Sequence, residues 1–210
     1  MESKKFPQFN EKKTIKVAFL VFDQVEALDL NGPIDVFAKA NFFGNRFELY
    51  SVSPNESLVY SEGNILQIKA TYNFSNAPQA DIIVIPGAEP SLAKQIGDSN
   101  IEIAEWIKSQ HKAAALIFSV CTGSVILAAT GILDNKKATT HFGAMQYLKM
   151  HESIEIVENV RYVLDDEVLT TAGITSGLDG TLYVIEEILG KEIADNVSKI
   201  LVYNRDAVYE

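Results

Sequence analysis

The stretch that decides the fold is Ile117-Phe118-Ser119-Val120-Cys121-Thr122-Gly123. An apolar run from Ala113 to Phe118 predicts a buried strand, and the apolar pattern after Gly123 predicts a helix. Small residues at positions 119 and 123 flank Cys121, which suits a sharp strand-to-helix turn because larger side chains would clash there. The pattern therefore predicts a nucleophile elbow that carries Cys121.

Such an elbow would make Cys121 chemically reactive. The free N–H groups at the start of the new helix would face the cysteine and favour its thiolate, which is the nucleophilic form. A buried structural cysteine is the alternative, and it is the usual state of a lone cysteine. The elbow context favours the reactive thiol.

The bulk properties of the chain limit its function classes. The chain has 210 residues, a formal net charge of −10 and a single cysteine. The acidic balance argues against nucleic acid or an anionic membrane as a partner, and no apolar run reaches the roughly 18 residues that span a bilayer. One cysteine excludes an intramolecular disulfide and fits a reducing cytoplasm. We expect residues 1–14 to be a flexible leader, which lacks the apolar core of a signal peptide. We expect one domain at 15–210 and a cytoplasmic protein.

The order of apolar segments indicates an α/β protein. Strands are predicted at 15–22, 47–52, 81–85, 113–119 and 168–171, with weaker ones at 154–157 and 160–164 and a hairpin over 58–70. Helices are predicted from Pro33, over 101–110, after Cys121, and over 142–150, 176–189 and 191–203. This alternation predicts a doubly wound, mostly parallel sheet with helices on both faces, as in flavodoxin-like folds. Ligands bind such sheets at the carboxyl ends of the strands.

Two strand ends besides the elbow carry candidate site residues. Asp29 lies between two leucines after the first strand, so burial would raise its pKa and let it pass a proton to or from Cys121. The alternative is that Asp29 only caps the following helix. Gly87 ends another strand and could turn its N–H toward a ligand as part of an oxyanion hole, together with the Thr122 N–H. The alternative there is an ordinary turn.

A third candidate is His141, since a histidine often activates a cysteine. A lone histidine is more often structural, so His141 is a secondary candidate. The sequence has no HExxH or CxxC spacing and no glycine-rich phosphate loop, so we expect neither a metal nor a cofactor.

Taken together, these segments resemble the ThiJ/PfpI superfamily of class I glutamine-amidotransferase-like proteins. The matching stretches are 28–33, 84–87, 119–123, 138–141 and 171–179. They run in family order between about 15 and 190, so the resemblance extends over nearly the whole chain. Within the superfamily they are most similar to the isonitrile hydratase branch and to the sensor domain of AraC-type regulators. The resemblance makes Cys121 the nucleophile, Asp29 its hydrogen-bonding acid and His141 a nearby histidine. Ala88 stands where the family usually has a second glycine, and its N–H could still serve the oxyanion hole.

The resemblance implies a homodimer that hydrates isonitriles to N-substituted formamides without a metal or organic cofactor. The alternatives are another cysteine-dependent amidase, hydrolase or deglycase, and a sensor that binds a small molecule or responds through oxidation of Cys121. The sequence ends at Glu210, so we expect no helix-turn-helix half and no DNA binding.

Overall fold

A seven-stranded sheet forms the centre of the molecule. The computed structural model describes residues 6–9 and 13–205. The sheet has the order β10-β11-β7-β6-β1-β2-β5, and its strands are parallel except for β10, which pairs antiparallel with β11. Its strands are β1 (Ile15–Leu20), β2 (Phe47–Ser53), β5 (Tyr72–Asn73), β6 (Ile82–Ile85), β7 (Leu116–Ser119), β10 (Tyr162–Asp165) and β11 (Val168–Thr171). The central strands β6, β7 and β11 are buried along their whole length, which explains their unbroken apolar sequences.

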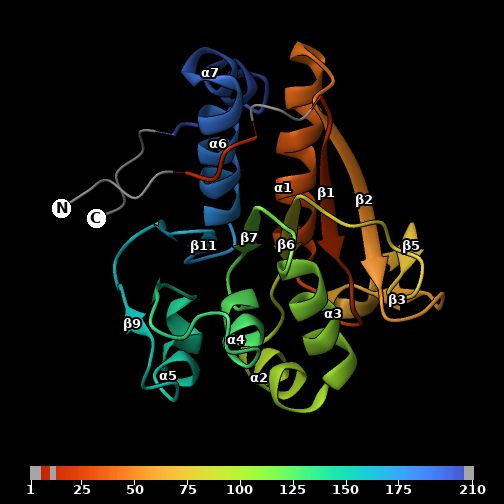
Figure 1. Cartoon of the computed structure of the whole chain (residues 1–210), viewed down its shortest axis with the longest axis vertical. Coiled ribbons are helices and arrows are strands. Elements are labelled where there is room, and N and C mark those ends of the chain that lie inside the picture. Colours follow the sequence, from red (N-terminus) through yellow and green to blue (C-terminus); the bar gives the residue numbers. More distant parts are fainter. Residues whose placement is uncertain (1–5, 10–12, 206–210) are drawn as a thin grey trace.

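Helices pack on the sheet in two groups. One consists of α1 (Ala27–Ala40), α6 (Ser176–Leu189) and α7 (Lys191–Ile200), which contact one another; the other consists of α2 (Pro90–Ser99), α3 (Ile101–His111) and α4 (Gly123–Ala128). Figure 1 shows the first group in the upper part of the molecule and the second in the lower part. Phe19, Phe37 and Phe118 are among the largest fully buried side chains. The predicted fold, a single doubly wound α/β domain, is confirmed.

Smaller elements complete the described chain. The hairpin predicted over 58–70 forms from β3 (Val59–Tyr60) and β4 (Gln67–Ile68), with the 3-10 helix η2 (Glu62–Asn64) between them. The remaining elements are η1 (Asn41–Phe43), β8 (Lys137–Ala138), η3 (Phe142–Ala144), α5 (Met145–Leu148) and β9 (Glu155–Ile156), and β8 pairs with β9.

The structure corrects the predicted start of the first helix. This helix begins at Ala27, with the Glu26 side chain accepting the Leu28 N–H as its N-cap, and Pro33 lies inside it. Pro33 is the seventh residue of the helix and lacks the N–H that would reach the Asp29 carbonyl four residues earlier, so the helix interior lacks that hydrogen bond. The proline was therefore the wrong marker for the start, and Asp29 belongs to the first turn rather than to a cap.

Two other segments differ from their predictions. The sequence pattern missed α2, which starts at Pro90 behind the N-cap Glu89. Part of the predicted leader, 1–5 and 10–12, lies outside the described residues, but Phe6 and Phe9 within it are buried. The Phe6 ring packs edge-on against Tyr183 of α6, with ring centroids 5.8 Å apart. Phe6 and Phe9 therefore pack on the core, which their polar neighbours in the sequence concealed.

Candidate functional site

The predicted elbow is present between β7 and α4. Cys121 has φ of 56°, a left-handed conformation that is rare for residues other than glycine. Its N–H donates to the Thr171 carbonyl at 3.1 Å, and its carbonyl accepts the hydroxyls of Ser124 at 3.2 Å and Thr140 at 3.1 Å. These bonds hold the strained residue in place, as is common at catalytic positions.

Gly123 is the residue that allows the elbow to close. A Cβ on Gly123 would lie 2.1 Å from the Ile85 carbonyl oxygen and 2.9 Å from that of Pro86. Any side chain there would push α4 away from the end of β6. The small residue at position 123 is therefore required by the close approach of the start of α4 to the end of β6.

The structure places Asp29 against the elbow. Its carboxyl group is fully buried in the first turn of α1, and Oδ2 accepts the Gly87 N–H at 3.0 Å. The carboxyl group also interacts with the Cys121 thiol by charge and hydrogen bonding. The segments that follow β1, β6 and β7 therefore bring Asp29, Gly87 and Cys121 together at one edge of the sheet.

Burial dominates the electrostatics of Asp29. Loss of water raises its pKa from the ordinary 3.8 to about 7, and the nearby charges of Glu26 and Glu62 add to the rise. The hydrogen bonds from Gly87 and Cys121 act in the opposite direction. Asp29 can therefore gain or lose a proton close to neutral pH, as general acid–base chemistry needs.

Burial also raises the pKa of Cys121, contrary to the sequence-based expectation of a stabilised thiolate. The thiol is only 5% exposed, and the negative charge of Asp29 raises its pKa further. The Thr122 N–H lowers it, but α4 is a single short helix and one amide does not offset the burial. Cys121 and Asp29 therefore form a pair that holds one proton between them above pH 7.

The backbone amides predicted to form an oxyanion hole have partners within the protein. The Gly87 N–H donates to Asp29, and the Ala88 N–H donates to Thr122 Oγ1 at 2.8 Å. Thr122 Oγ1 donates in turn to the Ala88 carbonyl at 2.7 Å. A Cβ on Gly87 would lie 2.3 Å from Thr122 Oγ1. In this arrangement the Thr122 N–H is the amide that faces the sulfur, while Gly87 and Ala88 position Asp29 and Thr122.

His141 directly follows Thr140, whose hydroxyl bonds to the Cys121 carbonyl, but His141 itself is not hydrogen-bonded to the thiol. Its Nδ1 accepts the Gly143 N–H at 3.2 Å, and partial burial lowers its pKa. The neutral ring therefore carries its proton on Nε2 and offers a donor. Among the described residues, no hydrogen bond joins His141 to Cys121, and the connection between them runs through the adjacent Thr140 hydroxyl.

Several site residues were missed from the sequence. Glu26 is one of them: its carboxyl hydrogen-bonds to that of Glu62, and its charge acts on Asp29. Its spacing of three residues before Asp29 on a helix could have indicated a shared face. The contacts of Thr140 and Thr171 with Cys121 depend on tertiary structure and have no local signal.

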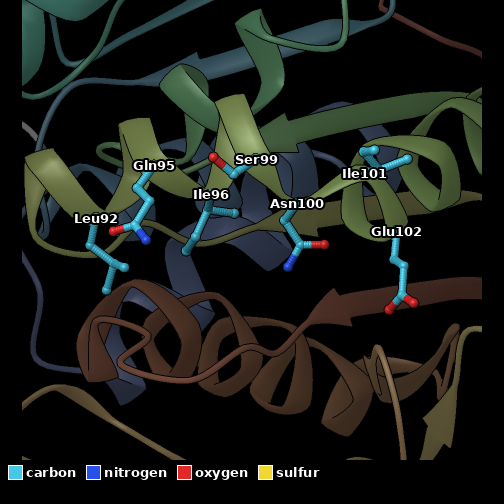
Figure 2. Close-up of a pocket in the computed structure, with 7 residues that line it drawn as sticks. All are labelled: Leu92, Gln95, Ile96, Ser99, Asn100, Ile101 and Glu102. Carbon is cyan, nitrogen blue, oxygen red and sulfur yellow. The ribbon is translucent and has the colours of Figure 1, made fainter.

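Two hollows lie on the surface near these elements. A cleft of about 880 Å³ is lined by residues 139–142, Met145, Lys149, 158–161 and 172–176. A second pocket, of about 500 Å³, lies at the α2–α3 junction, where Figure 2 shows Leu92, Gln95, Ile96, Ser99, Asn100, Ile101 and Glu102. None of the predicted site residues lines the second pocket, whereas the first includes His141.

Within the part of the chain that the structure describes, no three histidine, cysteine, aspartate or glutamate side chains gather as metal ligands. In that same part, each helix is too short or too polar to cross a membrane.

Comparison with known proteins gives consistent results. The model of the DJ-1/PfpI family matches residues 15–187. The chain is 34% identical to isonitrile hydratase from Pseudomonas putida over 189 residues, which are 90% of this chain and 78% of that protein.

Solved structures share the fold. A ThiJ/PfpI family protein from Pseudomonas syringae superposes with a TM-score of 0.82 and 26% identity, covering 95% of this chain and 81% of that one. An AraC family transcriptional regulator from Pseudomonas putida gives a TM-score of 0.70 at 19% identity, covering 89% and 99% respectively. The second likeness concerns the fold alone.

Proposed function

The chain belongs to the DJ-1/PfpI family, and from this premise we propose that it hydrates isonitriles to N-substituted formamides with Cys121 as nucleophile. The observation that carries the proposal is the buried Asp29 carboxyl beside the Cys121 thiol, with a pKa of about 7. The 34% identity to an isonitrile hydratase supports the choice of substrate.

The first step is addition of the thiol to the isonitrile carbon. Asp29, as carboxylate, accepts the thiol proton while the sulfur forms its bond to carbon, and then returns that proton to the same carbon. The product is a thioimidate, S–CH=N–R, on Cys121, and no atom has left. The Thr122 N–H faces the sulfur and stabilises negative charge on it during the attack.

The second step is hydration of the thioimidate. Water adds to the carbon while Asp29 accepts one of its protons and passes that proton to the nitrogen. The C–S bond of the resulting tetrahedral adduct then breaks while Asp29 transfers the proton of the adduct's hydroxyl to the sulfur, which releases the N-substituted formamide and restores the thiol. Covalent attachment divides one high barrier into two lower ones.

Turnover tests the proposal directly. We expect the purified protein to convert an aryl isonitrile to its formamide, detected by the formyl proton in NMR. Cys121→Ala and Cys121→Ser should abolish the conversion, since the acid–base group alone cannot form the thioimidate. Wild-type protein that leaves a panel of alkyl and aryl isonitriles unchanged would overturn the proposal.

The other outcomes identify the alternative functions. Release of ammonia from amides, or of lactate from glycated amines, dependent on Cys121, would indicate another cysteine-dependent hydrolase or deglycase. Saturable binding of a small molecule without turnover would indicate a sensor, in line with the fold shared with an AraC family regulator. The raised pKa of Cys121 disfavours a sensor based on thiol oxidation, because oxidation requires thiolate.

A homodimer also remains a proposal, since it follows from the family resemblance. Light scattering coupled to size exclusion measures it directly: a mass of twice 23.2 kDa would support it, and a single-chain mass at micromolar concentration would contradict it.

A further inference from the structure

A cleft of about 880 Å³ beside the elbow has no role in the reaction as described. Its volume falls in the range of small-molecule sites, roughly 300–1,000 Å³. The attacking sulfur and the reacting carbon need little of this space, so the cleft can accept a group far larger than the isonitrile function.

The cleft wall is joined at two points to the backbone of Cys121, which does not itself line the cleft. The carbonyl of Cys121 accepts the Thr140 hydroxyl at 3.1 Å, and Thr140 lines the cleft. The N–H of Cys121 donates to the Thr171 carbonyl, and the chain enters the cleft wall at the next residue, Ala172. Two of the three segments that form the cleft, 139–142 and 172–176, are therefore fixed through Thr140 and Thr171 to the backbone of Cys121.

Much of the cleft wall is apolar and exposed. Phe142 is 85% exposed and packs on the His141 ring with centroids 4.3 Å apart, and Ile174 is 36% exposed on the opposite segment. Met145 and Val160 also line the cleft. A ligand that covers these side chains would remove apolar surface from water, which favours binding.

The polar groups of the wall suit a neutral ligand. The cations that line it are paired, Lys149 with Glu158 at 2.7 Å and Arg161 with Asp179. Thr139 Oγ1 is buried in the wall and has no hydrogen-bond partner among the described residues. Its hydroxyl and the N–H of the neutral His141 ring offer hydrogen bonds that an uncharged polar atom of a ligand can satisfy.

We propose that this cleft binds the N-substituent of the substrate, and that the enzyme therefore takes isonitriles with bulky, uncharged, apolar substituents such as aryl or polycyclic groups. This inference rests on the proposed function. It adds a substrate class to the site, with Phe142 and Ile174 as residues that set specificity.

The test compares two isonitriles that differ only in substituent size. We expect a higher kcat/KM for naphthyl isonitrile than for methyl isonitrile. Phe142→Ala should lower that ratio by about tenfold through lost apolar contact, mainly by raising KM for the naphthyl substrate. Ile174→Trp should lower it as well, by filling the cleft.

The matched control is Ile101→Ala, which removes an apolar side chain that is 74% exposed in the separate α2–α3 pocket of Figure 2. This variant should keep the wild-type ratio. Equal kcat/KM for the two substrates in wild type, or an unchanged ratio in both cleft variants, would overturn the inference while leaving isonitrile hydration intact.

A binding measurement separates this inference from the proposed reaction. Saturation-transfer NMR with N-(1-naphthyl)formamide should show binding to wild type and to Ile101→Ala, with at least a several-fold weaker signal for Phe142→Ala. If no isonitrile is hydrated but this pattern is found, the cleft is still a site for bulky neutral groups. Absence of binding to wild type would overturn the inference.

Discussion

Asp29 lies in the first turn of α1 and Cys121 in the turn after β7, yet their side chains lie against each other at 0% and 5% exposure. Gly87 fits between their elements, donating its N–H to Asp29 Oδ2 at 3.0 Å and leaving no space for a Cβ beside Thr122. Burial raises the pKa of both acids, so the pair releases its first proton near pH 7 and holds the second into alkaline solution. The forms with carboxylate and thiol, or carboxylic acid and thiolate, are tautomers of one state, and the proposed reaction uses that state.

The pH dependence of turnover should follow the first proton of this pair. We expect kcat/KM to fall about tenfold per pH unit below about 7, the pKa of Asp29, because the doubly protonated pair cannot take up the thiol proton. Asp29→Asn should remove this inflection together with most of the activity. Glu26→Gln is the matched control: it removes a charge that raises the pKa of Asp29, so the inflection should move to lower pH. An unchanged inflection in Asp29→Asn would assign the titration to another group.

Stability should change with pH for the same reason. The folded pKa of Asp29, about 7, lies above its ordinary 3.8, so between these values the folded protein binds more protons than the unfolded chain. Wild-type stability should therefore fall as pH rises from 4 to 7. Asp29→Asn should abolish this pH-dependent loss. Above pH 7, the free energy of unfolding of the variant should exceed that of wild type by up to about 4 kcal/mol, since one pKa unit equals 1.36 kcal/mol. Urea unfolding at pH 4.5 and 8 measures the difference, and a variant that is less stable than wild type at pH 8 would contradict it.

Removing the Thr122 hydroxyl should destabilise the site. Thr122 Oγ1 accepts the Ala88 N–H and donates to the Ala88 carbonyl, and all three groups are buried. Thr122→Val leaves the Ala88 amide and carbonyl unpaired, so we expect a loss of about 1–3 kcal/mol in the free energy of unfolding. Thr122→Ser keeps the hydroxyl and should retain most of the wild-type free energy of unfolding. Equal stability of the valine and serine variants would show that the two hydrogen bonds contribute little.

His141 should not act as the base. Its Nδ1 is occupied by the Gly143 N–H, and no hydrogen bond connects it to Cys121 among the described residues. We therefore expect His141→Asn to lose less than the roughly 100-fold that removal of a general base costs. The inflection of kcat/KM near pH 7 should persist. A loss beyond that, with a shifted inflection, would return His141 to the catalytic role.

The sequence was informative where local chemistry decides structure. The elbow required small residues around Cys121, and β1, β6 and β7 required apolar runs, so the elbow and these core strands could be predicted before any coordinates. Burial of Asp29 and the rise in its pKa were also predictable, because its leucine neighbours indicated an apolar setting.

The remaining features depend on contacts between distant segments. The thiol pKa was predicted in the wrong direction because the elbow amide is visible in the sequence, whereas burial of the sulfur and the charge of Asp29 are not. Nothing in the sequence indicates that the Gly87 and Ala88 amides are used within the protein. The cleft is equally hidden, since it is assembled from residues 139–176 around separate short elements.

The most direct test of the account is the mass of Cys121 during turnover. Wild-type protein quenched in acid while it consumes an aryl isonitrile should carry an adduct equal to the mass of the whole isonitrile, located by peptide mapping on Cys121. Asp29→Asn should accumulate far less of it, because the proton transfer that accompanies attack is lost. Formamide production without any adduct on Cys121, or at an undiminished rate in Cys121→Ala, would contradict the account.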